Sequence, residues 1–148
     1  MNNLKIKIHF IFILLLTIDS YIYPQINNTE CQRIRDSLNI FYSRDYTFHK
    51  VPKIKGGLDS LLQKLNYPKE ALENKIEGKV YVNVIINTTG TPMCPEIVGK
   101  KLGYGCDVEA VKLVMIAKFT PAIMLRKKGT VKMTVPVSVP ITFTLKDQ

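Results

Sequence analysis

The chain has 148 residues, of which 46% are hydrophobic and 22% charged, and its formal net charge is +9. This composition is typical of one globular domain and excludes a disordered, collagen-like or coiled-coil chain. The positive charge by itself would favour a nucleic-acid partner, because clusters of lysine and arginine neutralise phosphates. The N-terminal residues argue against that partner, since they predict export.

The first 25 residues are typical of an export signal. Lys5 and Lys7 precede an apolar run from Ile8 to Ile18, which Asp19 ends. A run of this length matches the hydrophobic part of a signal peptide and is shorter than the ~20 residues of a membrane-spanning helix. Two interpretations stay open, a cleaved signal peptide and a short membrane anchor that is retained. Both place the rest of the chain in the periplasm or cell envelope, away from nucleic acid.

Three cysteines lie beyond this segment, at Cys31, Cys94 and Cys106. An exported protein favours a disulfide. Cys94 and Cys106 would close a short loop and are the preferred pair, although three pairings are open and unbridged buried thiols are an alternative. The cysteine spacing does not match a zinc site, and His49 is the single histidine beyond the export segment. No pattern for a catalytic site or cofactor is found either, so the sequence predicts a non-enzymatic protein.

Residues 26–50 form a lead-in segment, and the domain proper is expected over residues 51–146. A short helix is predicted in the lead-in, because apolar side chains recur there on one helical face, at Cys31, Ile34, Leu38 and Phe41. Two helices are predicted next. The first carries a stripe of leucines with helical spacing, at Leu58, Leu61, Leu62 and Leu65. The second begins at Pro68 and ends before Gly78.

The period then changes from that of a helix to that of a strand. In residues 80–86 every even position is apolar, which predicts a strand. Asn87 to Gly90 form a turn, and residues 93–100 follow it as a second strand, so a hairpin is expected. Pro95 interrupts this second strand. A helix is expected over residues 108–119, with Asp107 as its N-terminal cap.

From Val131 to Leu145 every odd position is apolar, which predicts one long C-terminal strand. Pro136 and Pro140 share the even parity and have no N–H. We therefore expect the odd residues to bond to the hairpin and the even residues to line an open edge, with a bend near the prolines. The expected fold class is α+β, in two layers, with two or three helices packed on a small antiparallel sheet.

Seven segments in order resemble the C-terminal domain of TonB-type energy transducers. They are Val51-Pro52 with Gly56-Gly57, Tyr67-Pro68, Glu77 to Val80, Asn87 to Gly90, Gly105 to Ala110, Phe119 to Ala122 and Val137 to Leu145. The resemblance covers Val51 to Leu145. It implies a non-enzymatic periplasmic domain that grips the box peptide of an outer-membrane transporter by strand addition to its last strand.

The resemblance and the shared parity of the two prolines both predict a binding edge on the C-terminal strand. The predicted peptide-binding residues are Thr134, Pro136, Ser138, Pro140, Thr142 and Thr144. An exposed sheet edge without a ligand is the alternative interpretation. A retained anchor would add inner-membrane motor proteins as partners, and the open edge would also allow an edge-to-edge homodimer. The lead-in is short for the long spacer of an energy transducer, so a stand-alone envelope interaction or assembly module is the alternative function.

Overall fold

The structure is a computed structural model that describes residues 28–42 and 48–145. The chain divides into two compact units, Met1–Arg33 and Ile34–Gln148, and all elements below except the start of the first helix belong to the second. In chain order they are α2 (Asn28–Tyr42), β1 (Phe48–Lys50), α3 (Gly57–Leu62), α4 (Lys69–Glu73), β2 (Gly78–Ile86), β3 (Pro92–Val98), α5 (Cys106–Ile116), β4 (Ala122–Arg126), β5 (Gly129–Met133) and β6 (Val135–Phe143).

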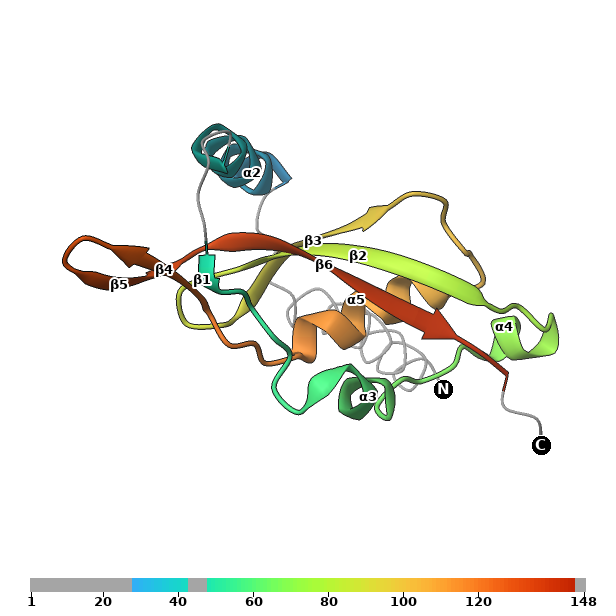
Figure 1. Ribbon diagram of the computed structural model, residues 1–148. Helices are drawn as coiled ribbons and strands as arrows, with labels where there is room; N and C mark the ends of the chain where they lie inside the picture. Colours follow the sequence, from blue (N-terminus) through green and yellow to red (C-terminus); the bar gives the residue numbers. More distant parts are fainter. Residues whose placement is uncertain (1–27, 43–47, 146–148) are drawn as a thin grey trace, which may run out of the picture. The chain divides into compact units, whose positions relative to one another are not determined.

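Two three-stranded antiparallel sheets form the β part of the second unit. Their strand orders are β3-β2-β6 and β1-β4-β5. Figure 1 shows α5 crossing beneath the first sheet, while the β4–β5 hairpin extends away from α5. The predicted α+β class is confirmed. The prediction of one sheet with a single long C-terminal strand is wrong, because β5 and β6 belong to different sheets.

The long strand is divided at Thr134, which lies between β5 and β6. Before this residue the chain pairs with β4, across the tight turn that joins Arg126 to Gly129. After it the chain pairs with β2 from Val135↔Ile86 to Phe143↔Gly78. The expected interruption therefore exists, and it falls ahead of both prolines.

The core lies between the sheet β3-β2-β6 and the helix α5. The even residues of β2 face this core, and Val82 and Val84 have no exposed surface. Leu113 and Val114 meet them from α5, and Phe143 meets them from β6. Burial of each such side chain contributes ~1.5–3 kcal/mol to the free energy of unfolding. The hydrophobic effect therefore fixes which face of β6 points inward.

The β2–β3 hairpin forms as predicted, and its turn and its irregular strand have local causes. Asn87 caps the turn, because its side-chain oxygen accepts hydrogen bonds from the N–H groups of Thr89 and Thr91, at 3.0 and 2.9 Å. The register of β2 with β3 shifts at Cys94, whose φ of 53° is left-handed. Such a shift is a β-bulge, which accommodates Pro95 in the strand.

Helix ends depart from the predictions: α4 spans only Lys69–Glu73, and α5 spans Cys106–Ile116 rather than residues 108–119. The first predicted helix ends at Leu62, so Leu65 lies in the connection after it. Asp107 does not cap α5; Gly105 holds the N-cap position, and the Asp107 carboxylate accepts hydrogen bonds from the N–H groups of Leu102 and Gly103. The carboxylate therefore orders the loop before the helix.

The lead-in helix predicted from Cys31, Ile34, Leu38 and Phe41 is present as α2, and Ile34 and Leu38 are half-buried. The predicted export segment, residues 1–25, lies outside the described residues. No helix in the described ranges is long and apolar enough to span a membrane.

Candidate functional site

The strand β6 lies at the edge of its sheet. It pairs with β2 along nine positions, and no strand of the described chain pairs with its other side. Its odd residues Val135, Val139, Ile141 and Phe143 are buried, whereas Pro136 and Ser138 are exposed. The pairing with β2 and the buried side chains hold the strand in place. The backbone groups along its outer edge remain available for hydrogen bonds.

The outer edge carries fewer donors than an ordinary strand edge. In an antiparallel ladder each residue directs its N–H and C=O to the same neighbour, and successive residues alternate between neighbours. Since Pro136 and Pro140 have no N–H, we infer that the odd residues bond to β2 and the even residues face outward. The edge then offers four carbonyl acceptors but only two N–H donors within β6, at Ser138 and Thr142.

Of the six predicted site residues, four lie within β6 and two lie just outside it. Pro136, Ser138, Pro140 and Thr142 are in the strand, and Thr134 and Thr144 flank its ends. Opposite them on the exposed face of β2 lie Asn83, Tyr81 and Lys79, which pair with Ser138, Pro140 and Thr142. The structure thus brings the predicted residues together along one line, and their role in binding stays a prediction.

A groove opens at the C-terminal end of this line. It has a volume of about 1150 Å³, and its lining includes Thr142, Thr144 and Leu145 together with Leu62, Leu65, Tyr67 and Leu72. Sequence reasoning missed it, because the leucine stripe predicted a helix buried against the core. Within that stripe only Leu61 is fully buried, and Leu62 and Leu65 line the groove.

Tyr67 holds the wall of the groove against the end of β6. Its ring meets Phe143 edge to face, with ring centroids 5.5 Å apart and an interplanar angle of 88°. Its hydroxyl donates a hydrogen bond to the carbonyl of Ile76. Burial, and then the nearby Cys106 and Glu77, raises the pKa of Tyr67, so the hydroxyl keeps its proton for this hydrogen bond. The groove wall is therefore anchored by both packing and a hydrogen bond.

The predicted disulfide between Cys94 and Cys106 is wrong. Cys94 is disulfide-bonded, whereas Cys106 is a free, buried thiol at the start of α5. Burial and the adjacent Asp107 raise the pKa of Cys106. The prediction rested on proximity in sequence, but Cys106 faces the core, where it packs as a small apolar side chain.

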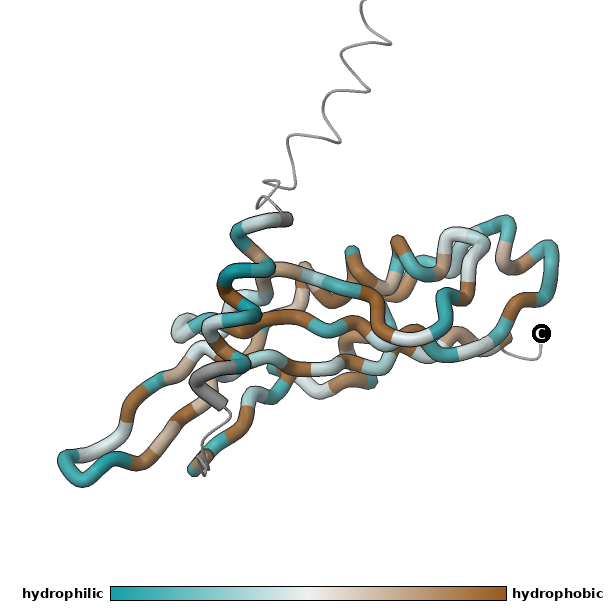
Figure 2. Tube along the Cα trace, turned by 90° about the horizontal axis from the view of Figure 1, so that it is seen from above, coloured by the Kyte–Doolittle hydropathy of each residue, from teal (hydrophilic) through white to brown (hydrophobic). Residues whose placement is uncertain are grey.

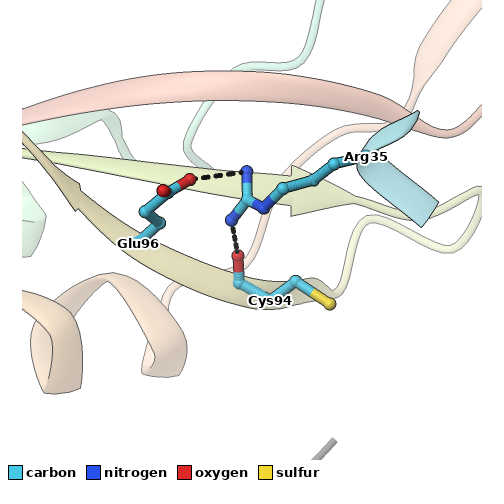
Figure 3. A network of polar contacts seen from close by, with 3 residues as sticks. All are labelled: Arg35, Cys94 and Glu96. Atoms are coloured by element: carbon cyan, nitrogen blue, oxygen red, sulfur yellow. Dashed lines mark hydrogen bonds and ion pairs between the residues drawn. The ribbon is translucent and has the colours of Figure 1, made fainter. Parts of the chain in front are cut away.

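Arg35 on α2 makes two contacts with β3, which Figure 3 shows. Its guanidinium forms an ion pair with Glu96 at 3.2 Å and donates a hydrogen bond to the carbonyl of Cys94. The Arg35 side chain is 18% exposed and that of Glu96 is 56% exposed. The contact with the bulge at Cys94 supplies a partner for a carbonyl that the irregular strand leaves out of its ladder.

Among the residues that the structure describes, no cluster of His, Cys, Asp or Glu could hold a metal ion. No buried side-chain polar atom there lacks a hydrogen-bond partner.

The chain is similar to known proteins of one family. A family profile described as Gram-negative bacterial TonB protein C-terminal matches residues 63–145, which is more than half of the chain. The chain belongs to this family. A solution NMR structure of the TonB C-terminal domain from Helicobacter pylori is 23% identical over 61% of this chain and 90% of that chain, with a TM-score of 0.43. A search of curated proteins found no match.

Proposed function

We propose that this protein is a non-enzymatic periplasmic binding domain that takes up the N-terminal box peptide of an outer-membrane transporter by adding it as a strand to β6. The observation that carries the proposal is the unpaired edge of β6, which is rigidly held on its other side by nine register positions with β2. Strand addition takes its affinity from main-chain hydrogen bonds and its specificity from side chains. Family membership supports this partner and the periplasmic location.

The distribution of donors on the edge sets a requirement for the peptide. Its own N–H groups must supply most of the hydrogen bonds, because Pro136 and Pro140 accept but do not donate. The groove beside Thr142 and Thr144 would receive a side chain from the end of the added strand. Its lining combines leucines with Asp59, Gln63 and Lys75, so both apolar and polar groups would contact that side chain.

The test is a titration of the full chain with fluorescently labelled box peptides from transporters encoded in the same genome, followed by fluorescence anisotropy. Ser138→Pro removes one of the two donors and adds a ring at the docking edge, so we expect binding to weaken roughly tenfold or more. Ser138→Ala keeps the N–H and should bind within about twofold of the original chain, since a neutral exposed side chain adds little.

Both variants should unfold at nearly the same urea concentration as the original chain, because the Ser138 N–H bonds to no strand of the sheet. A peptide methylated on its alternate backbone nitrogens serves as the second control, and it should lose binding. If no peptide binds at millimolar concentration, or if Ser138→Pro binds like Ser138→Ala, the proposal is wrong.

A further inference from the structure

We propose that the β4–β5 hairpin inserts its tip into the headgroup region of an anionic lipid bilayer. This interaction would be separate from peptide binding, because the hairpin belongs to the other sheet. Three properties of the hairpin support it: its charge, the apolar side chains that it exposes and the faces from which these project.

The hairpin carries several positive charges close together in the sequence. From residue 110 to residue 146 the sequence contains no Asp or Glu, whereas Arg126, Lys127, Lys128 and Lys132 lie on the hairpin. All four are exposed, and none has an acidic partner within residues 28–42 and 48–145. Charges this close in sequence lie within a Debye length of about 8 Å and act together on an anionic surface.

The hairpin also exposes large apolar side chains next to these cations. Leu125 is 59% exposed and Val131 is 41% exposed. In Figure 2 the tip is hydrophilic, and hydrophobic segments follow it along both strands. Basic residues beside exposed apolar ones are the pattern of segments that bind at a membrane interface.

The register places these two apolar side chains on opposite faces of the hairpin. Leu125 pairs with Thr130, and Val131 pairs with Met124, one position further along. Since cross-strand pairs share a face and successive residues alternate, Leu125 and Val131 point in opposite directions. A flat protein surface would cover only one of them, whereas a bilayer interface surrounds an inserted tip on both faces.

On the face that carries Leu125, apolar and basic residues also lie side by side further from the tip. On that face Ile123 lies between Lys132 of β5 and Lys50 of β1, and both lysines are exposed. On this face, two exposed lysines therefore flank the apolar side chain of Ile123. Lysine stems pack along apolar surface while their ammonium groups reach phosphate oxygens, which fits the boundary of a bilayer.

Single tryptophans report the position of the hairpin, because the chain has no Trp of its own. The full chain is made as Leu125→Trp, as Val131→Trp and as the control Val108→Trp, which lies on α5 and is 59% exposed. Each is mixed with vesicles of phosphatidylglycerol and phosphatidylcholine, or of phosphatidylcholine alone. The apolar run from Ile8 to Ile18 can itself hold the chain on a vesicle, so the emission of each tryptophan, rather than sedimentation, is measured.

We expect the emission of Trp at 125 and at 131 to shift to the blue, and to be quenched by brominated lipid, only with the anionic vesicles. Trp at 108 should not respond. Replacing Arg126, Lys127 and Lys128 with Gln in the Leu125→Trp chain should raise the lipid concentration at half-response about 100-fold, because each cation near an anionic surface contributes about 1 kcal/mol, or about fivefold.

Four outcomes would overturn the proposal. They are no response at either hairpin position, a response at one face alone, an equal response with neutral vesicles, and an equal response at position 108. A blue shift with a soluble polyanion such as heparin, in the absence of any response to vesicles, would identify a polymer as the partner and would also reject insertion into a bilayer.

Discussion

Val131 and Val139 occupy the same alternating pattern of one continuous segment, yet Val131 is 41% exposed and Val139 only 3%. The difference arises from what lies opposite each strand. α5 packs on the sheet that contains β6, whereas β5 pairs with β4 in the other sheet. Alternation of apolar and polar residues therefore predicts a strand, but it does not predict whether a second layer covers its apolar face.

The sheet that α5 covers also contains a close backbone contact, at the turn between β2 and β3. Gly90, in the β2–β3 turn, has a φ of +85° and accepts a hydrogen bond from the N–H of Phe119 at 3.0 Å. A Cβ atom on Gly90 would lie 2.1 Å from the Phe119 carbonyl oxygen. This turn is thereby fixed to the segment that follows α5, and only a glycine fits there.

Gly90→Ala should have the largest effect on stability. We expect it to lower the free energy of unfolding by ~4 kcal/mol or more, because it combines a backbone clash with a left-handed conformation. Urea unfolding of the full chain, followed by circular dichroism, measures the loss.

The matched control is Gly99→Ala, since Gly99 has a φ of +82° and a Cβ atom at this position would have no neighbour within 4 Å. It should cost only ~1–2 kcal/mol, which is the penalty of the left-handed conformation alone. Equal losses for both variants would show that the contact between Gly90 and Phe119 is absent.

Val139→Ala and Val131→Ala test the contrast between the covered strand and the uncovered one. At position 139 the change removes two buried methyl groups and leaves a cavity, so the free energy of unfolding should fall by ~2–3 kcal/mol. At position 131 the same change should cost less than ~0.5 kcal/mol, because the side chain is largely in water already. Similar losses at the two positions would mean that the hairpin is covered in solution.

A further expected effect is a pH dependence of stability that arises from Cys106. Burial raises the pKa of this thiol, so the folded state favours the protonated form. Its contribution to stability is complete below the unfolded pKa of about 8.5 and is lost as the pH rises from there towards the folded pKa, with a slope of at most about 1.4 kcal/mol per pH unit. Urea unfolding at about pH 8 and pH 9.5 should show a steeper loss for the original chain than for Cys106→Ala, and parallel losses would contradict it.

The sequence predicts those parts of the fold in which local pattern and tertiary partner agree. The alternation over residues 80–86, with the turn at Asn87, specifies a hairpin that the structure contains. The parity of Pro136 and Pro140 predicts an edge strand, since two missing donors on one side exclude a central position. These features depend on local properties of the residues, such as the missing N–H of proline, and not on distant contacts.

The features that the sequence did not reveal depend on contacts between distant segments. β4 contains the apolar run Ile123 to Leu125, which has no alternation, and it becomes a strand because β1 and β5 pair with it. The groove beside β6 exists because nothing in the described chain covers Leu62 and Leu72. The cysteine pairing failed for the same reason, because nearness in sequence says little about which side chains face the core.

The two prolines of β6 also determine how the edge treats a second copy of itself. Two β6 strands aligned antiparallel about Ser138 would set Pro136 of one copy against Pro140 of the other, and neither could donate, so both hydrogen bonds of each such pair would be lost. A foreign strand without proline forfeits only the bond that each proline would have donated. In this register the edge therefore pairs less well with a second copy of itself than with a foreign strand.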